Sequence, residues 1–301
     1  MGNNPSDLAY DSVKGELFVT NLHSGSVSVL SDITNQVVTN VTVGGGPLGI
    51  AYDAVKGEIF VANTFDDTVS VIADSNDTVV ATVQVETNEY SGVAYDPDKG
   101  EVFVSSNNSV SVISDSNNSV VASIPVGLTP SGIAYDSGRN EIFVANFDSN
   151  SVSVISDSNN SVVATVSVGS SPTGIAFNND ENELFIANTG SNSVSVISDA
   201  NNTVIATLTT GEMPSGVAFK AYDNEVFVAN GNDGTVSVIS NTVTTPSSPN
   251  PSQSPPVPEF SLPSLIFILV AIILGPYCLI RSKKAAEKRR VSCVKGHLGL
   301  R

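Results

Sequence analysis

Cysteine, histidine, tryptophan and basic residues are scarce in this chain, and the shortages exclude several classes of protein. There is no Trp, and the only cysteines are Cys278 and Cys293, so a disulfide framework cannot organise the fold. The histidines, His23 and His297, lie far apart, and no CxxC, GxSxG or phosphate-loop motif is present. We therefore expect no catalytic residues, no metal ligands and no bound cofactor.

Basic side chains are scarce over most of the chain and crowded at its end. Residues 1–245 carry 28 acidic residues against five basic ones, whereas residues 246–301 carry eight basic residues against two acidic ones. An acidic body repels phosphate backbones, so we expect no nucleic-acid partner. The acidity fits a well-solvated surface or one that attracts cations, and we favour the first interpretation.

Val, Ser and Asn are abundant. They occur in four short sequence motifs, here called words, that repeat about every 42 residues. The first word ends in an aromatic residue in each of six copies, with spacings of 42, 43, 40, 42 and 42. The words consist mostly of β-branched and aromatic residues, bounded by Gly, Asn, Asp or Pro, which is typical of strands. A four-stranded unit cannot bury both its faces alone, but copies stacked around an axis can. The sequence predicts an all-β fold, a β-propeller of six four-stranded blades with an incomplete last blade.

Some residues recur because the blades require them. A glycine two residues after a proline heads the first strand, and we expect it to allow close approach at a crowded axis. Asn and Asp in the turn SDSNNS tolerate the left-handed backbone of hairpin turns. The recurring glycines are Gly49, Gly92, Gly132, Gly174 and Gly216, and the recurring second-word phenylalanines are Phe18, Phe60, Phe103, Phe143, Phe185 and Phe227. In unit one Asp7 replaces the glycine, and in unit three Tyr90 replaces the proline.

Blades reading PSGIAYD, EIFVAN, NSVSVIS and VVATVSVG resemble the YVTN-type β-propeller repeats of prokaryotic, especially archaeal, surface-layer-like proteins. The resemblance covers about residues 5–240 and implies the propeller fold, but propellers host unrelated activities. Such propellers commonly have seven blades, whereas this chain has six. Either the ring closes with a thin last blade, or an N-terminal portion precedes Met1.

The chain after the propeller divides into three parts. We place the propeller at 1–243, a disordered Pro/Ser-rich linker at 244–261, a transmembrane helix at 262–280 and a basic cytoplasmic tail at 281–301. Basic residues mark the cytoplasmic side, so the propeller should face outward, which requires an export signal that the first residues do not supply. The order PEF, apolar span, basic cluster also resembles the archaeal PEF-type C-terminal sorting signal, which implies cleavage and a lipid anchor.

Asparagine and aspartate in the turns give two candidate kinds of site. Four of six N-x-S/T sequons fall at the same outer hairpin turn, where either glycosylation or turn chemistry explains them. Asp66, Asp67, Asp148 and Asp233 share one loop position and could bind Ca²⁺, although solvated loop acids are the favoured interpretation. The glutamates that start the second strands, such as Glu16 and Glu58, are expected to accept bonds from loop amides. The sequons begin at Asn40, Asn76, Asn107, Asn117, Asn159 and Asn201.

Three hypotheses of function follow. The favoured one is a non-enzymatic, membrane-anchored cell-surface propeller that mediates adhesion by binding envelope proteins or glycans, since interchangeable blades suit multivalent contacts. The second is a propeller enzyme, such as a lactonase- or lyase-like hydrolase, which needs unlike polar groups at one axial mouth. The third is a structural, S-layer-like coat component.

Overall fold

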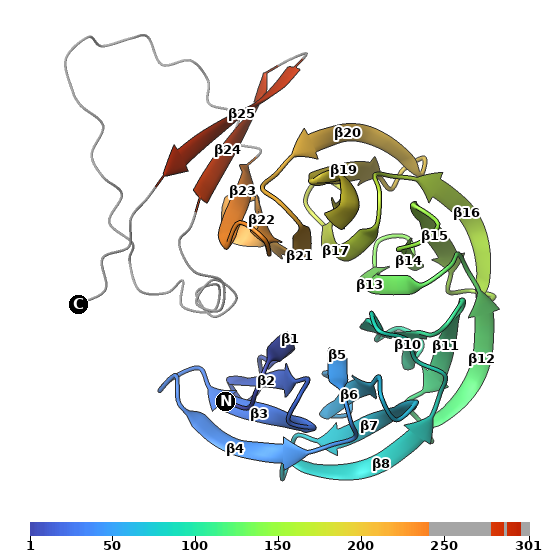
Figure 1. Ribbon diagram of the computed structural model, residues 1–301. Coiled ribbons are helices and arrows are strands. Elements are labelled where there is room, and N and C mark those ends of the chain that lie inside the picture. Colours follow the sequence, from blue (N-terminus) through green and yellow to red (C-terminus); the bar gives the residue numbers. More distant parts are fainter. Residues whose placement is uncertain (241–277, 286–287, 296–301) are drawn as a thin grey trace.

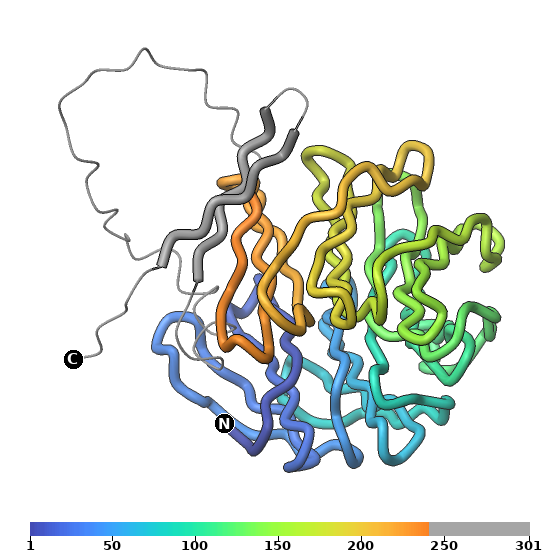
Figure 2. Tube along the Cα trace, turned by 45° about the horizontal axis from the view of Figure 1, so that its top comes forward, coloured from blue at the N-terminus to red at the C-terminus, as the bar shows by residue number. Residues whose placement is uncertain are grey.

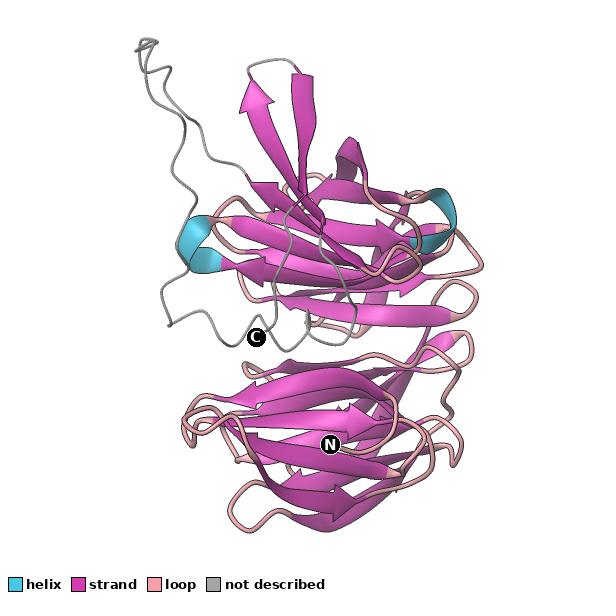
Figure 3. Cartoon of the chain, turned by 60° about the vertical axis from the view of Figure 1, so that its left-hand side comes forward, coloured by secondary structure: helices cyan, strands magenta, loops and turns pink. Residues whose placement is uncertain are grey.

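The computed structural model describes residues 1–240, 278–285 and 288–295. In the first of these ranges each repeated word forms a strand, and consecutive strands pair into antiparallel sheets. Five sheets have four strands and the sixth has three, so six blades with an incomplete last blade are confirmed for this range. Figure 3 shows strands and turns throughout, apart from two single-turn 3-10 helices, η1 (Thr189–Ser191) and η2 (Ala221–Asp223).

The strands follow the words closely, and in each blade they run in chain order from the axis to the rim. The first three blades contain β1 (Pro5–Asp11), β2 (Glu16–Asn21), β3 (Ser26–Ser31), β4 (Val37–Thr42), β5 (Pro47–Asp53), β6 (Glu58–Asn63), β7 (Thr68–Ala73), β8 (Thr78–Gln84), β9 (Val93–Asp96), β10 (Glu101–Ser105), β11 (Ser109–Ser114) and β12 (Ser119–Pro125). The last three contain β13 (Pro130–Asp136), β14 (Glu141–Asn146), β15 (Ser151–Ser156), β16 (Ser161–Ser167), β17 (Pro172–Asn178), β18 (Glu183–Asn188), β19 (Ser193–Ser198), β20 (Thr203–Thr209), β21 (Pro214–Lys220), β22 (Glu225–Asn230) and β23 (Thr235–Ser240).

The blades follow one another around an arc. Figure 1 shows β1, β5, β13, β17 and β21 toward the axis and β4, β8, β12, β16 and β20 along the rim, and Figure 2 follows the chain from blade to blade. Five hydrophobic clusters each join two consecutive blades. Phe60 of blade two, for example, packs with Val102 and Val104 of blade three and is fully buried. Burying such a side chain contributes about 1.5–3 kcal/mol, so each blade is stabilised mainly by its neighbours.

The repeated phenylalanines lie where this packing needs them. In the first five blades they are at most 1% exposed. Phe227, in the three-stranded blade six, is half-buried. The first five phenylalanines therefore belong to the buried core.

The inner-strand glycines permit close approach between blades, as the sequence predicts. A Cβ on Gly132 would lie 2.2 Å from the carbonyl oxygen of Thr173 in the next blade, far inside van der Waals contact. Gly49, Gly92 and Gly174 meet the next inner strand in the same way. At Gly216, in the last blade, the nearest atom among the described residues is 3.8 Å from such a Cβ.

The turn chemistry also agrees with the sequence. Asn118, Asn160 and Asn202, the second asparagine of the repeated turn, have φ of 52°, 51° and 53°. This left-handed backbone is accessible to asparagine at little cost. The tight turn fixes the register of the two outer strands.

Little of the predicted C-terminal organisation falls within the described residues. Strands β24 (Cys278–Ala285) and β25 (Lys288–Lys295) pair as an antiparallel hairpin. The linker at 244–261 and the predicted span up to residue 277 lie outside the described residues, while the last three residues predicted for the span belong to β24. Within the described part of the chain, no helix has the length and apolar character to cross a membrane.

Candidate functional site: the two loop faces

The antiparallel blades present two faces made of different turns. We call entry face the one formed by the turns between second and third strands, such as 64–67, and by the connections into the next blade, such as 43–46. We call lysine face the opposite one, formed by turns such as 54–57 and 74–77. Successive turns of a meander lie at opposite ends of its strands, which separates the two sets of residues.

Beneath the entry face, a buried asparagine ends the second strand of five blades. The Asn63 side-chain amide donates to Thr68 at 3.0 Å and to Ser70 at 2.9 Å on the neighbouring strand. Asn21, Asn146, Asn188 and Asn230 make the same pair of bonds five and seven residues further along the chain. Blade three uses Ser106 and Ser111 instead. These bonds hold the hairpin and use the amide nitrogen of each repeated asparagine as the donor.

The loop acids considered as calcium ligands bind the loops themselves. Asp66 accepts a bond from the Gly45 amide at 2.6 Å, and Asp67 accepts one from the Thr87 amide at 3.1 Å. Asp148 accepts from the Thr129 hydroxyl, and Asp233 from the Glu212 amide at 2.7 Å. Each acid thus fixes the loop that enters its own blade or leaves it. Among the described residues, no three His, Cys, Asp or Glu side chains are grouped as metal ligands.

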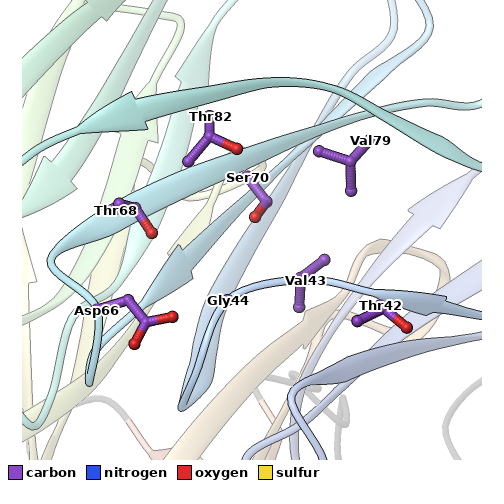
Figure 4. A pocket seen from close by; sticks show the side chains of 8 residues that line it. All are labelled: Thr42, Val43, Gly44, Asp66, Thr68, Ser70, Val79 and Thr82. Carbon is purple, nitrogen blue, oxygen red and sulfur yellow. The ribbon is translucent and has the colours of Figure 1, made fainter.

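A small groove lies between blades one and two near the entry face (Figure 4). Its volume is about 320 Å³. Its lining consists mostly of hydroxyl-bearing and small side chains, with the single carboxylate of Asp66. Such a surface can exchange hydrogen bonds with a polar ligand, but it brings no acid and base together. The lining residues are Thr42, Val43, Gly44, Asp66, Thr68, Ser70, Val79 and Thr82.

On the lysine face, basic side chains tie each of the first four blades to the next. The ammonium groups of Lys14, Lys56 and Lys99 donate to the carbonyl oxygens of Asp74, Asp115 and Asp157 in the following blade. Arg139 of blade four does the same to Ala200 of blade five at 3.3 Å. Four of the five bases in residues 1–240 therefore act as clamps between blades.

Three of the strand-initial glutamates lie beside the basic residue of their own turn, and Glu101 also accepts a bond from the side-chain amide of Asn160, in a turn of blade four, at 3.4 Å. Glu16 and Glu101 lie 3.8 and 3.9 Å from the lysine two residues earlier, and Glu141 lies 3.2 Å from the Arg139 side chain. Because the base and the glutamate share one turn, the pair forms locally. Glu16, Glu101 and Glu141 thus lie beside the blade clamps.

Tyrosines complete the lysine face by donating to carboxylates. Tyr10 donates to Asp32 at 2.9 Å, and this bond to a carboxylate raises the pKa of Tyr10. Tyr52 donates to Asp74 at 3.2 Å, and burial together with the nearby Asp11 carboxylate raises the pKa of Tyr52. The phenols therefore stay protonated at neutral pH and act as donors that join strands.

Asp7 is the acid that breaks the repeat at the axis. It stands where the other blades have glycine, and its side chain is exposed. Its carboxylate accepts a bond from the Leu8 amide at 2.8 Å. Although the side chain reaches solvent, the inner strands packed around it at the axis weaken the solvation of its charged form, and this desolvation raises the pKa of Asp7 to about 6. Carboxyl groups with a pKa near neutrality can exchange protons with a ligand.

A second departure from the repeat produces an aromatic pair on the entry face. Tyr90 of blade three stacks on Phe147 of blade four, with ring centroids 4.6 Å apart and planes 15° from parallel. Tyr90 is 37% exposed, and nearby Leu128 is 55% exposed. These residues differ from blade to blade, whereas those that hold the blades together recur.

The sequence-predicted sites are spread over the surface. All six sequon asparagines are exposed, and Asn76, Asn117, Asn159 and Asn201 occupy the turns between third and fourth strands in blades two to five. In each of these turns the asparagine accepts a bond from the sequon hydroxyl at 2.7 Å. His23 is exposed in an entry-face turn, and His297 lies outside the described residues.

Two features escaped prediction. The clamps had a visible signal, because Lys14, Lys56, Lys99 and Arg139 all stand two residues before the strand-initial glutamate. The aromatic pair had a weaker signal, the loss of proline at Tyr90, and nothing local pointed to Phe147 as its partner. Contacts between non-repeated residues require the blade geometry.

The arrangement defines a six-bladed β-propeller whose repeated polar groups are structural. Residues 3–203 match the family model of the YNCE-like beta-propeller, and the chain belongs to that family. None of the curated proteins matches the chain in sequence.

Two solved structures share the fold at low identity. A protein of unknown function from Desulfotomaculum acetoxidans DSM 771 aligns with a TM-score of 0.66 and 21% identity, covering 75% of each chain. Kuenenia stuttgartiensis hydrazine synthase aligns with a TM-score of 0.57 and 16% identity, covering 80% of this chain and 96% of the other. At these identities the similarity concerns the fold alone.

Proposed function

We propose that this chain is a non-catalytic binding propeller of the cell surface, anchored through the apolar segment at 262–280, that contacts proteins or glycans of the cell envelope. The observation that carries the proposal is that repeated and non-repeated residues have different roles in the structure. Repeated asparagines and tyrosines join strands within a blade and repeated lysines join neighbouring blades, while Tyr90, which replaces the repeated proline, is exposed on the entry face and stacks on Phe147. Variable loops on a rigid scaffold are the usual place for recognition.

The sequence supports the location. The apolar segment is long enough for a membrane span, the basic cluster after it favours a cytoplasmic C-terminus, and the proline-rich linker can act as a stalk. The sequon asparagines are exposed, so glycans on them would project into solvent.

Surface labelling tests the location. A membrane-impermeant amine reagent applied to intact native cells should label the lysines of the propeller, and disruption of the cells should then expose the basic tail to the same reagent. Labelling of the propeller only after disruption would overturn the proposed topology. The intact mass of the native protein tests glycosylation, because a mass equal to that of the polypeptide would exclude it.

Asp7 favours a second candidate, a hydrolase with its acid at the axial mouth. A carboxyl group with a pKa of about 6 could donate and accept a proton near neutral pH. This candidate predicts hydrolysis of a small lactone or aryl ester by the full chain and its loss in Asp7→Asn. Hydrolysis that is unchanged in Asp7→Asn, or no hydrolysis at all, would leave the binding function as the better account.

A further inference from the structure

The entry face carries an apolar platform at the junction of blades three and four. We call aromatic patch the group Tyr90, Phe147 and Leu128. The rings of Tyr90 and Phe147 are stacked, and the Leu128 carbonyl accepts a bond from the amide of Asp148, the residue after Phe147, at 3.3 Å. Tyr90 is 37% and Leu128 55% exposed, so the patch presents apolar surface to solvent.

The loop that carries Tyr90 is held in one conformation. The Asn88 side chain accepts a bond from the Tyr90 amide at 2.7 Å. It also donates to the carbonyl of Ser106 in blade three at 2.7 Å and to that of Pro130 in blade four at 2.8 Å. The ring is therefore positioned before a ligand arrives, which lowers the entropy cost of binding.

Charge is distributed unevenly around this patch. Glu86 and Glu89, close to Tyr90 in the same connection, and Asp148, next to Phe147, are all exposed. The five basic residues of 1–240 belong instead to the lysine face, four in its clamps and Lys220 at the end of β21, where it pairs with Asp223. The patch therefore combines aromatic faces with unbalanced negative charge.

We propose that the aromatic patch binds a basic segment of a partner protein, with an arginine or lysine head over the exposed face of Tyr90. The ring attracts the cation through its quadrupole, the aliphatic stem of the base covers Leu128, and the exposed carboxylates add long-range attraction. A neutral glycan would gain nothing from the excess of negative charge. The inference rests on the proposed binding function and narrows its partner to a basic polypeptide.

A binding titration with the full-length protein tests the inference. The probe is a fluorescein-labelled peptide of three Arg-Leu repeats, and the matched charge control has Glu in place of Arg. Tyr90→Ala should weaken binding of the Arg peptide about tenfold, the loss expected for one cation–π contact and its covered surface. Tyr90→Phe keeps the ring and should bind like the unmodified protein. Tyr222→Ala removes a 93% exposed tyrosine of the lysine face and should have no effect.

Each outcome of the titration either supports or overturns the inference. Binding of the Arg peptide that weakens with salt, falls in Tyr90→Ala and survives in Tyr90→Phe supports the inference. Equal binding of both peptides, equal loss in Tyr90→Ala and Tyr222→Ala, or binding of neutral oligosaccharides at this patch in place of the Arg peptide would overturn it. Surface labelling of native cells is independent of the peptide, so failure here with labelling intact rejects the partner class and leaves the proposed function standing.

Discussion

The side-chain amide of Asn63 donates to the hydroxyl of Ser70, seven residues along the chain, at 2.9 Å. Both residues are almost completely buried, and four other blades form the same bond. The bond satisfies the side-chain amide nitrogen and the hydroxyl at the end of the central hairpin in these five blades, where water cannot reach them. This explains why the second word ends in Asn and the third contains the Ser of Val-Ser-Val.

Replacing this asparagine should therefore destabilise the propeller. Asn63→Ala removes two bonds and leaves the Ser70 hydroxyl buried, which should lower the free energy of unfolding by about 1–3 kcal/mol. Asn63→Ser imitates blade three and should lower it less, while Asn179→Ala, at an exposed position, should change it by less than about 0.5 kcal/mol. Urea unfolding followed by circular dichroism measures these differences, and equal losses for all three variants would contradict the bond's role.

The inner-strand glycines should differ in their tolerance of a methyl group. Gly132→Ala places a Cβ 2.2 Å from a backbone oxygen of the next blade and should lower the free energy of unfolding by about 1–3 kcal/mol or more through overpacking. Gly216→Ala meets its nearest described atom at 3.8 Å and should change the free energy far less. Thermal unfolding of the two variants compares them directly, and a larger loss for Gly216→Ala would contradict the packing at the axis.

The clamps should contribute to cohesion between blades in a salt-dependent way. Lys99→Met removes the bond to the Asp157 carbonyl and the attraction of Glu101, and because Lys99 is partly exposed the loss should be about 1 kcal/mol at low salt. Lys220→Met removes only an ion pair within its own turn, so it should cost less. Unfolding at low and high salt would show the gap between the variants narrowing; a gap that widens with salt would rule out an electrostatic clamp.

Stability should increase on mild acidification. Desolvation raises the pKa of Asp7 to about 6 and also raises those of Asp136 and Asp157 above their ordinary values. The folded state therefore binds more protons than the unfolded one between about pH 4 and pH 6. The stabilisation that these carboxyl groups provide is fully present below about pH 4, and it should be lost as the pH rises through about 6. Melting temperatures between pH 4 and pH 8 check this, and Asp7→Asn should flatten the profile; a midpoint that rises with pH would contradict it.

The repeat made most of the fold predictable, because each strand and turn has a local cause. Pro47 can stand only at a strand entrance, Gly49 permits close approach at the axis, and Asn118 accepts a left-handed backbone. Each of these causes acts within a few residues. Because these causes recur in the repeats, each repeat predicts the same strands and turns.

The candidate sites were harder to predict because they depend on contacts between blades. Lys56 reaches a carbonyl 59 residues away, and Tyr90 stacks on a ring of the following blade. The loop acids show the same limit: the position of Asp66 and Asp67 leaves both solvated acids and calcium ligands open, and only the structure shows that each accepts a bond from a backbone amide. Position in a repeat shows which residues are equivalent, but only the packed structure shows what each one touches.

The stack of Tyr90 on Phe147 also bears on how the chain reaches its native order. Eleven residues recur verbatim at 108–118 and 150–160, so hairpins from different blades can exchange partners with nearly equal energy while the chain is folding. Blades that enter through a proline cannot form the stack, and it therefore marks the junction of blades three and four as different from every other. This departure from the repeat therefore favours the native order of the blades over arrangements in which similar hairpins have exchanged partners.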